Sequence, residues 1–189
     1  MNYRFYIAFF IIFGIGTSAV FLVSSGYYPV AIVNGHFIPA KSFAHDYSIA
    51  STYYKNLLKA GNASSSAQTS LTEDQIGQSV LSQLIENALI DGGVRKEVGG
   101  NLNKMIDEKV NQAIAFPDAE KAISAFYGIT LEDFKKDILV PQAKRDILTG
   151  NLLLKGEKID DWLQTAKKSS SVIVLSGRFY WDGENVGVR

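Results

Sequence analysis

Two histidines and one neighbouring carboxylate are the side chains in this sequence that could support acid–base or metal chemistry. His36 lies in a predicted strand, and His45 lies in a predicted helix with Asp46 directly after it. A metal site or an acid–base pair needs a third convergent group, and the sequence does not supply one. We therefore expect both histidines to be surface or packing residues, and we predict no catalytic residue and no metal site.

Other features also argue against an enzyme. The acidic pairs Glu132-Asp133 and Asp160-Asp161 come at predicted helix starts, where the helix dipole favours negative charge. The chain has no cysteine, which excludes disulfides, thiolate catalysis and zinc–thiolate sites. Motifs for phosphate loops, serine nucleophiles and zinc proteases are absent from the sequence. We predict a protein that is not an enzyme and has no cofactor.

The charge balance indicates what kind of partner the protein has. Lysine plus arginine number 19, and aspartate plus glutamate also number 19, so no net field attracts nucleic acid. Residues 119–139 have the outline of a helix-turn-helix, but the second helix would carry a mixture of acidic and basic side chains that suits phosphates poorly. We therefore expect no nucleic-acid partner and infer that the partner is another protein.

An apolar run near the start of the chain predicts a membrane anchor. It begins at Phe5, ends at Val23, and is close to the roughly 20 residues that a helix needs to cross a bilayer. Arg4 precedes the run, whereas the first charge after it is Lys41, which favours a cytoplasmic N-terminus. Residues 1–25 are thus predicted to be a single-pass signal anchor and short tether.

A cleaved signal peptide is the alternative for this segment, with Val23, Ser24 and Ser25 as a tolerable cleavage site. In both cases residues 26–189 form one extracytoplasmic domain. About 160 residues are enough for one hydrophobic core. Without cysteines, packing alone must hold that core together.

Strands are predicted at both ends of this domain. Residues 30–33 and 36–38 flank Asn34-Gly35, which favours the positive φ angles of a type I′ hairpin turn. The tail at residues 171–181 is predicted to be either one strand or a hairpin that turns at Ser176-Gly177. We expect the two ends to meet in one small antiparallel sheet.

The segments between the strands are predicted to be helices, so the fold class is mainly α. The clearest helix begins at Thr72, which forms a capping box with Gln75 and precedes the narrow apolar stripe of a central buried helix. A bend or an end is expected at Gly92-Gly93 and at Pro141, and Asp118 is a predicted helix cap. The remaining helices are predicted over residues 39–60, 102–115, 119–127, 130–141 and 158–168.

Three segments carry a family resemblance. They are VAIVNGHFI at residues 30–38, VLSQLIENALI at residues 80–90 and YGITLEDFKKDI at residues 127–138. Their motifs and order resemble the N-terminal chaperone domain of SurA and its relatives among the parvulin-type foldases. The resemblance implies a helical domain that binds unfolded polypeptides. It also implies a bacterial cell, with the anchor in the inner membrane and the domain in the periplasm.

The chain departs from the usual layout of that family. A parvulin isomerase domain usually follows, but here Gly156 leads directly into the predicted helix at residues 158–168. The glycine-rich and histidine-bearing parvulin motifs are missing as well. We therefore expect no prolyl isomerase activity, and a separate isomerase or envelope protein is a further expected partner.

Two functional hypotheses follow. The first is a membrane-tethered holdase that binds unfolded or newly exported polypeptides in an apolar groove between helices. Its predicted client-binding residues are Tyr53, Tyr54, Phe126 and Tyr127, which form aromatic pairs that cannot all point inward. The second is a structural or adaptor protein that docks one envelope partner through the same fold. A holdase binds many unfolded chains weakly, whereas an adaptor binds one folded partner.

Overall fold

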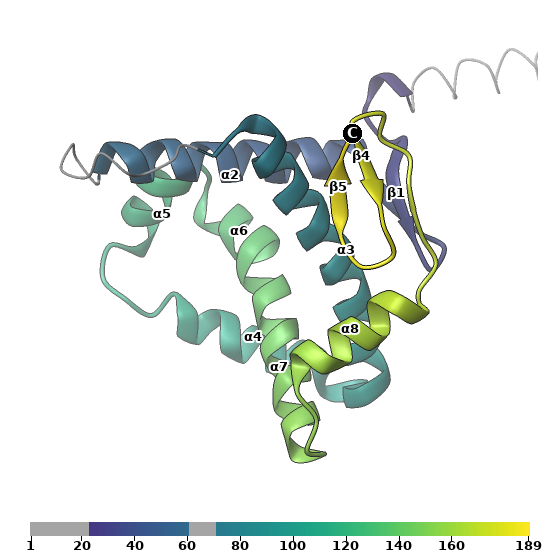
Figure 1. Ribbon diagram of the computed structural model, residues 1–189. Coiled ribbons are helices and arrows are strands. Elements are labelled where there is room, and N and C mark those ends of the chain that lie inside the picture. Colours follow the sequence, from purple (N-terminus) through teal and green to yellow (C-terminus); the bar gives the residue numbers. More distant parts are fainter. Residues whose placement is uncertain (1–22, 61–70) are drawn as a thin grey trace, which may run out of the picture.

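The computed structural model describes residues 23–60 and 71–189 of the 189-residue chain (Figure 1). The described part is mainly helical and includes small antiparallel sheets, as predicted. Its elements in chain order are β1 (Pro29–Val33), β2 (His36–Pro39), α2 (Ala40–Ala60), α3 (Glu73–Val98), η1 (Gly99–Asn101), α4 (Leu102–Ala113), α5 (Ala119–Tyr127), α6 (Leu131–Phe134), the π-helical turn η2 (Lys135–Leu139), α7 (Val140–Leu154), α8 (Ile159–Ser169), β3 (Val172–Val174), β4 (Phe179–Trp181) and β5 (Val186–Val188).

The predicted membrane anchor lies almost wholly outside the described residues, because its apolar run covers residues 5–23. In residues 23–60 and 71–189, the structure contains no helix that is both long and apolar enough to span a bilayer. The anchor and its orientation therefore stay predictions.

The first sheet joins the two ends of the domain, as the sequence predicts. Its strand order is β2-β1-β3, and β1 pairs antiparallel with both neighbours. The turn between β1 and β2 has φ angles of 50° at Asn34 and 83° at Gly35, which fits the predicted type I′ hairpin. The side chain of Asn34 also accepts a hydrogen bond from the Ser171 N–H at 2.9 Å, so the hairpin tip is fastened to the start of β3.

The C-terminal tail differs from both predicted alternatives. It is neither one strand nor a hairpin at Ser176-Gly177, because β3 ends first and β4 then forms a separate two-stranded sheet with β5. The turn lies between β4 and β5, where one carboxylate oxygen of Asp182 accepts hydrogen bonds from the N–H groups of Glu184 at 2.8 Å and Asn185 at 2.6 Å. This turn also includes Gly183, at a positive φ of 111°, so an aspartate and a glycine make the reversal here instead of at the predicted Ser176-Gly177.

Helix α3 is the central helix, and its predicted capping box is confirmed. The Gln75 N–H donates to the Thr72 hydroxyl oxygen at 3.2 Å, and the Thr72 N–H donates to the Gln75 side-chain oxygen at 2.8 Å. The helix does not end at Gly92-Gly93, one of the two predicted alternatives, because α3 continues to Val98. A Cβ atom on Gly93 would lie 2.5 Å from the Trp162 ring. The absence of a side chain at Gly93 therefore allows Trp162 of α8 to pack closely against α3.

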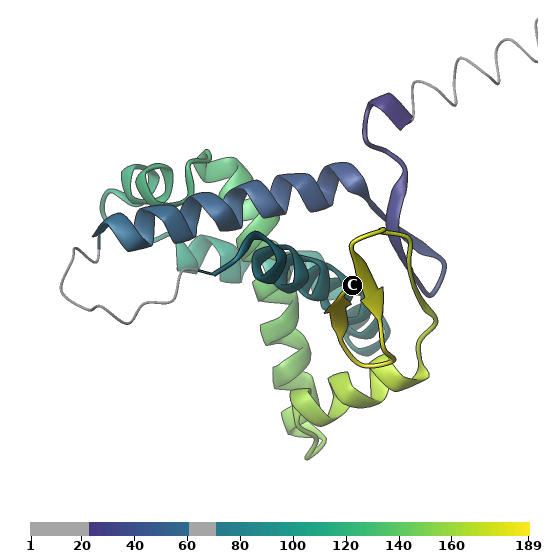
Figure 2. The same cartoon turned by 45° about the horizontal axis from the view of Figure 1, so that its top comes forward.

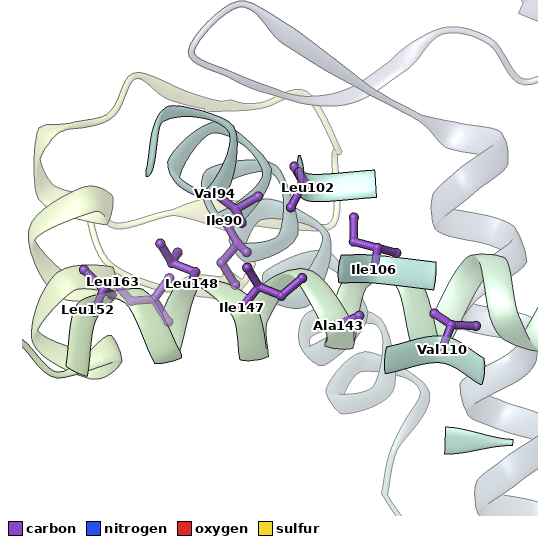
Figure 3. Close-up of a cluster of buried hydrophobic side chains, with 10 residues drawn as sticks. All are labelled: Ile90, Val94, Leu102, Ile106, Val110, Ala143, Ile147, Leu148, Leu152 and Leu163. Atoms are coloured by element: carbon purple, nitrogen blue, oxygen red, sulfur yellow. The ribbon is translucent and has the colours of Figure 1, made fainter. Parts of the chain in front are cut away.

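Buried side chains in the described residues form two clusters on either end of α3. One cluster lies between α3, α4, α7 and α8 (Figure 3), and the other lies between α3 and the strands. The first contains Ile90, Val94, Leu102, Ile106, Val110, Ala143, Ile147, Leu148, Leu152 and Leu163. The second contains Ala31, Val33, Ile38, Leu81, Ile85, Leu89, Phe179 and Val186.

Two local expectations about helix ends are corrected. Pro141 does not break its helix, because α6, η2 and α7 follow one another without a gap, and the Val140 N–H donates to the Lys135 carbonyl five residues earlier. This wider turn accommodates a proline, which has no N–H to donate. Asp118 adopts a left-handed conformation, and its carboxylate accepts from Lys121 Nζ at 2.9 Å rather than capping α5.

Candidate functional site

Helix α2 is only partly covered by the rest of the domain. Among its 21 residues, all of them described, Ile49 is the one that is buried. The helix extends across α3 and reaches α5 near its C-terminal end (Figures 1 and 2). Its aromatic and aliphatic side chains are therefore left half-buried or exposed along the second half of its length.

An open cavity of about 600 Å³ lies between this second half of α2 and the start of α3. Most of its lining is apolar or aromatic, with three small hydroxyl side chains and one charged residue from each helix. The lining residues are Tyr47, Ser48, Ser51, Thr52, Tyr54, Lys55, Leu57, Leu58, Leu71, Glu73 and Ile76.

A second cavity, of about 230 Å³, adjoins the first. It is enclosed by α2, α3, α5 and η2, and it shares Tyr54 and Ile76 with the larger cavity. We call the two cavities together the aromatic groove. The second cavity is lined by Asp46, Ile49, Ala50, Tyr53, Tyr54, Ile76, Ser79, Val80, Gln83, Tyr127, Asp137 and Ile138.

Four aromatic rings form a connected series, and three of them, Tyr53, Tyr54 and Tyr127, line the groove. Tyr53 stacks on Tyr127 with ring centroids 4.8 Å apart and planes 18° apart. Tyr54 meets Tyr53 edge to face at 5.9 Å, and Phe134, which lines neither cavity, contacts the Tyr127 ring at 4.9 Å. Because each ring is held by a neighbour, this wall needs little ordering when it binds a ligand.

Helix α5 is held against α2 by polar contacts at its C-terminal end. The side-chain nitrogen of Asn56 donates to the carbonyls of Ala125 at 2.9 Å and Phe126 at 3.1 Å. Gly128 then ends α5 with a positive φ of 70°, the conformation that favours glycine at a helix end. These contacts fix Tyr127 beside the groove.

Two carboxylates, Asp46 and Asp137, line the second cavity, and His45 lies beside them. His45 Nε2 and Asp137 Oδ2 are 2.9 Å apart, which brings α2 into contact with η2. The pKa of Asp46 is raised to about 6, and burial is the main cause. The charge of His45 acts to lower this pKa, and the charge of Asp137 acts to raise it. Both carboxylates line the cavity, so the groove has an acidic portion as well as an aromatic wall.

Metal binding has no support in this arrangement. In residues 23–60 and 71–189, no three histidine, aspartate or glutamate side chains are placed to hold a metal ion. The histidine at position 45 is paired with one carboxylate, and His36 is exposed at the hairpin turn.

The structure brings together three of the four predicted client-binding residues. Tyr53, Tyr54 and Tyr127 line the aromatic groove, whereas Phe126 is exposed on α5 and lines neither cavity. Binding of a client by these residues stays a prediction. Sequence reasoning missed Asp137 as a groove residue, because no local pattern connects it with α2.

The helices that enclose the groove fall mostly within residues 4–137, which match the family model described as the SurA-like N-terminal domain. This match covers more than two thirds of the 189 residues. The chain belongs to this family. The predicted resemblance is therefore confirmed, and the SurA-like domain is the non-catalytic, chaperone-like part of its family. No curated protein and no solved structure matches the chain.

Proposed function

We propose that this SurA-like protein is a membrane-tethered holdase. It binds unfolded or newly exported polypeptides outside the cytoplasm and has no prolyl isomerase activity of its own. The observation that carries the proposal is the aromatic groove, whose rings are ordered by their neighbours yet remain partly accessible. A groove of this kind can bury the apolar side chains of an unfolded chain.

The size and chemistry of the groove support a polypeptide ligand. The larger cavity, at about 600 Å³, is within the range of about 300–1,000 Å³ that is typical of ligand pockets. Its lining also includes Ser48, which is exposed, and Thr52, which is half-buried. A bound peptide backbone would offer hydrogen-bond partners to these hydroxyl groups.

The proposed location follows from the apolar run at residues 5–23. In this proposal the run crosses the inner membrane with the N-terminus in the cytoplasm, and residues 26–189 are in the periplasm. A tether would keep the groove near the site where exported chains emerge. Clients reach it as unfolded segments, and a separate isomerase would act on them in trans.

The decisive experiment measures aggregation of several unrelated, chemically unfolded proteins by light scattering, with full-length protein in lipid nanodiscs. We expect the wild type to suppress aggregation of most clients and to leave prolyl isomerisation of a model peptide unchanged. A groove variant that combines Tyr53→Ser, Tyr54→Ser and Tyr127→Ser should lose most of the suppression. Circular dichroism checks that this variant keeps its helical content.

A matched control removes as many apolar side chains away from the groove. It combines Phe116→Ser, Leu153→Ser and Leu154→Ser, three exposed residues that line neither cavity. Equal suppression by the groove variant and the control would reject the groove as the binding site. Suppression of no client at all would favour the adaptor hypothesis, in which one folded envelope protein binds instead.

A further inference from the structure

The outer face of the first sheet carries a row of apolar side chains. Phe37 on β2 and Ile173 on β3 are both paired with Ile32 on β1, one on each side. Residues directly opposite one another in a sheet project to the same face. Ala31 and Val33, the β1 neighbours of Ile32, are buried in the core, so this row faces away from the core.

The row is well exposed and continues beyond the three paired residues. Phe37 is 68% exposed and Ile173 is 50% exposed. Leu175 lies two residues after Ile173, and is 53% exposed. Tyr27 and Tyr28, which lead into β1, are about half exposed as well. An apolar surface of this extent is unusual on a protein that is surrounded only by water.

The segment before β1 is fastened to the domain by backbone hydrogen bonds. The Lys41 N–H donates to the Gly26 carbonyl at 2.8 Å, and the Ala40 N–H donates to the Tyr28 carbonyl at 2.9 Å. The Gly26 N–H in turn donates to the Val23 carbonyl at 3.1 Å. The last residue of the apolar run is thus held close to the sheet.

Little chain separates the apolar run from the apolar face. Even fully extended, the five steps from Val23 to Tyr28 would span at most about 18 Å, and the turn at Gly26 shortens that distance. The Lys41 ammonium lies 5.3 Å from the centroid of the Tyr27 ring. A lysine beside exposed tyrosines is the combination that suits the headgroup region of a bilayer.

We propose that this apolar sheet face lies on the surface of the bilayer that holds residues 5–23. The inference rests on the membrane tether of the proposed function and adds an orientation to it. The groove is lined by α2 residues from Asp46 to Leu58, which are about 9–27 Å along the helix from its first residue, Ala40. Contact at the sheet therefore leaves the groove free for clients.

Fluorescent labels on single cysteines test this contact, because the natural chain has no cysteine. Full-length Phe37→Cys and Ile173→Cys variants, each labelled with an environment-sensitive dye, are inserted into phosphatidylcholine and phosphatidylglycerol vesicles that contain a spin-labelled quencher lipid. The control is Leu154→Cys, at an 89% exposed position at the end of α7 remote from α2 (Figure 1). We expect quenching at positions 37 and 173 to exceed the control at least about two-fold.

Flotation of the same vesicles separates the two proposals. If the protein floats with the vesicles but positions 37 and 173 are quenched no more than the control, the contact is overturned and the tether stands. If the protein does not float, the tether is wrong and the contact falls with it. Efficient disulfide formation between two Phe37→Cys chains would assign the face to a second copy and would also overturn the proposal.

Discussion

The ring of Tyr127 stacks on the ring of Tyr53, with centroids 4.8 Å apart and an angle of 18° between their planes. This contact joins α5 to α2 and at the same time forms a wall of the aromatic groove. Both rings are half-buried. One pair of side chains therefore contributes to the stability of the domain and to the surface proposed for client binding.

The stack should contribute measurably to stability. Tyr127→Ala removes the contacts with Tyr53 and Phe134, so we expect the free energy of unfolding to fall by about 2 kcal/mol. Tyr127→Phe keeps the ring and should cost less than about 0.5 kcal/mol. Denaturant unfolding in detergent micelles, followed by circular dichroism, measures both. Equal losses in the two variants would show that the ring contact contributes nothing.

Alanine substitutions at two adjacent glycines of α3, Gly92 and Gly93, should change the stability of the protein in opposite directions. In Gly93→Ala the new methyl group would collide with the Trp162 ring, and we expect a loss of about 1–3 kcal/mol. At Gly92 no atom lies within 4 Å of a built Cβ, so Gly92→Ala should gain about 0.5–1 kcal/mol from helix propensity. Thermal unfolding compares the two variants. A stabilised Gly93→Ala protein would contradict the packing of Trp162 on α3.

Glu86 of α3 forms ion pairs with α7 and α8. It should contribute more to the free energy of unfolding than a typical surface ion pair does. Its carboxylate accepts from Lys167 Nζ at 2.6 Å and from Arg145 Nη1 at 3.2 Å. Glu86→Ala should cost about 1–2 kcal/mol, because it leaves the mostly buried Lys167 without this partner. The control, Glu108→Ala, affects an exposed pair with Lys104 at 3.9 Å and should cost less than about 0.5 kcal/mol.

The Glu86 contribution should also depend on pH. Burial acts to raise the pKa of Glu86, but the hydrogen bonds from Lys167 and Arg145 outweigh burial. The pKa of Glu86 therefore lies below its ordinary value of 4.5. The stabilisation is therefore present above about pH 4.5 and is lost as the pH falls through the lowered pKa. The difference in unfolding free energy between wild type and Glu86→Ala should shrink on acidification below pH 4.5. An unchanged difference down to pH 3 would argue against the ion pairs.

Ionisation of Asp46 should destabilise the folded protein, in contrast to ionisation of Glu86, and over a higher pH range. Burial raises its pKa from 3.8 to about 6, so the folded protein binds more protons than the unfolded protein between those values. Its ionisation therefore costs stability at neutral pH, and this cost disappears as the pH falls from about 6.5 to 4. Asp46→Asn should raise the melting temperature at pH 7.5 and lose that advantage near pH 4. An exposed helix carboxylate, in Asp107→Asn, provides the control.

Features encoded by neighbouring residues were predictable. The capping box of Thr72 and Gln75 and the hairpin turn at Asn34-Gly35 involve residues within three positions of each other, and both are confirmed. Features that depend on distant contacts were not. Gly93 lies inside a helix because Trp162 covers it, and Pro141 is accommodated by the π-helical turn before it. Neither compensation is visible in the local sequence.

The residues of the candidate site also fall into those that local sequence predicts and those that depend on distant contacts. Tyr53, Tyr54 and Tyr127 were identifiable as aromatic pairs, but Phe126, the fourth predicted residue, lies outside the groove. A helix turns by about 100° per residue, so one member of an adjacent pair can face the groove while the other faces away. Asp137 enters the site only because α5 and η2 fold back onto α2.

The sequence by itself determined the helical class, the hairpin, the central helix and the family. Each of these depends on local periodicity, on turn chemistry or on short motifs in a fixed order. Tertiary structure alone decided that α2 stays partly uncovered, that two cavities adjoin beside stacked tyrosines, and that an apolar row crosses the outer sheet face. These properties depend on how helices and strands distant in sequence are arranged, and burial and packing set that arrangement only when the whole chain has folded.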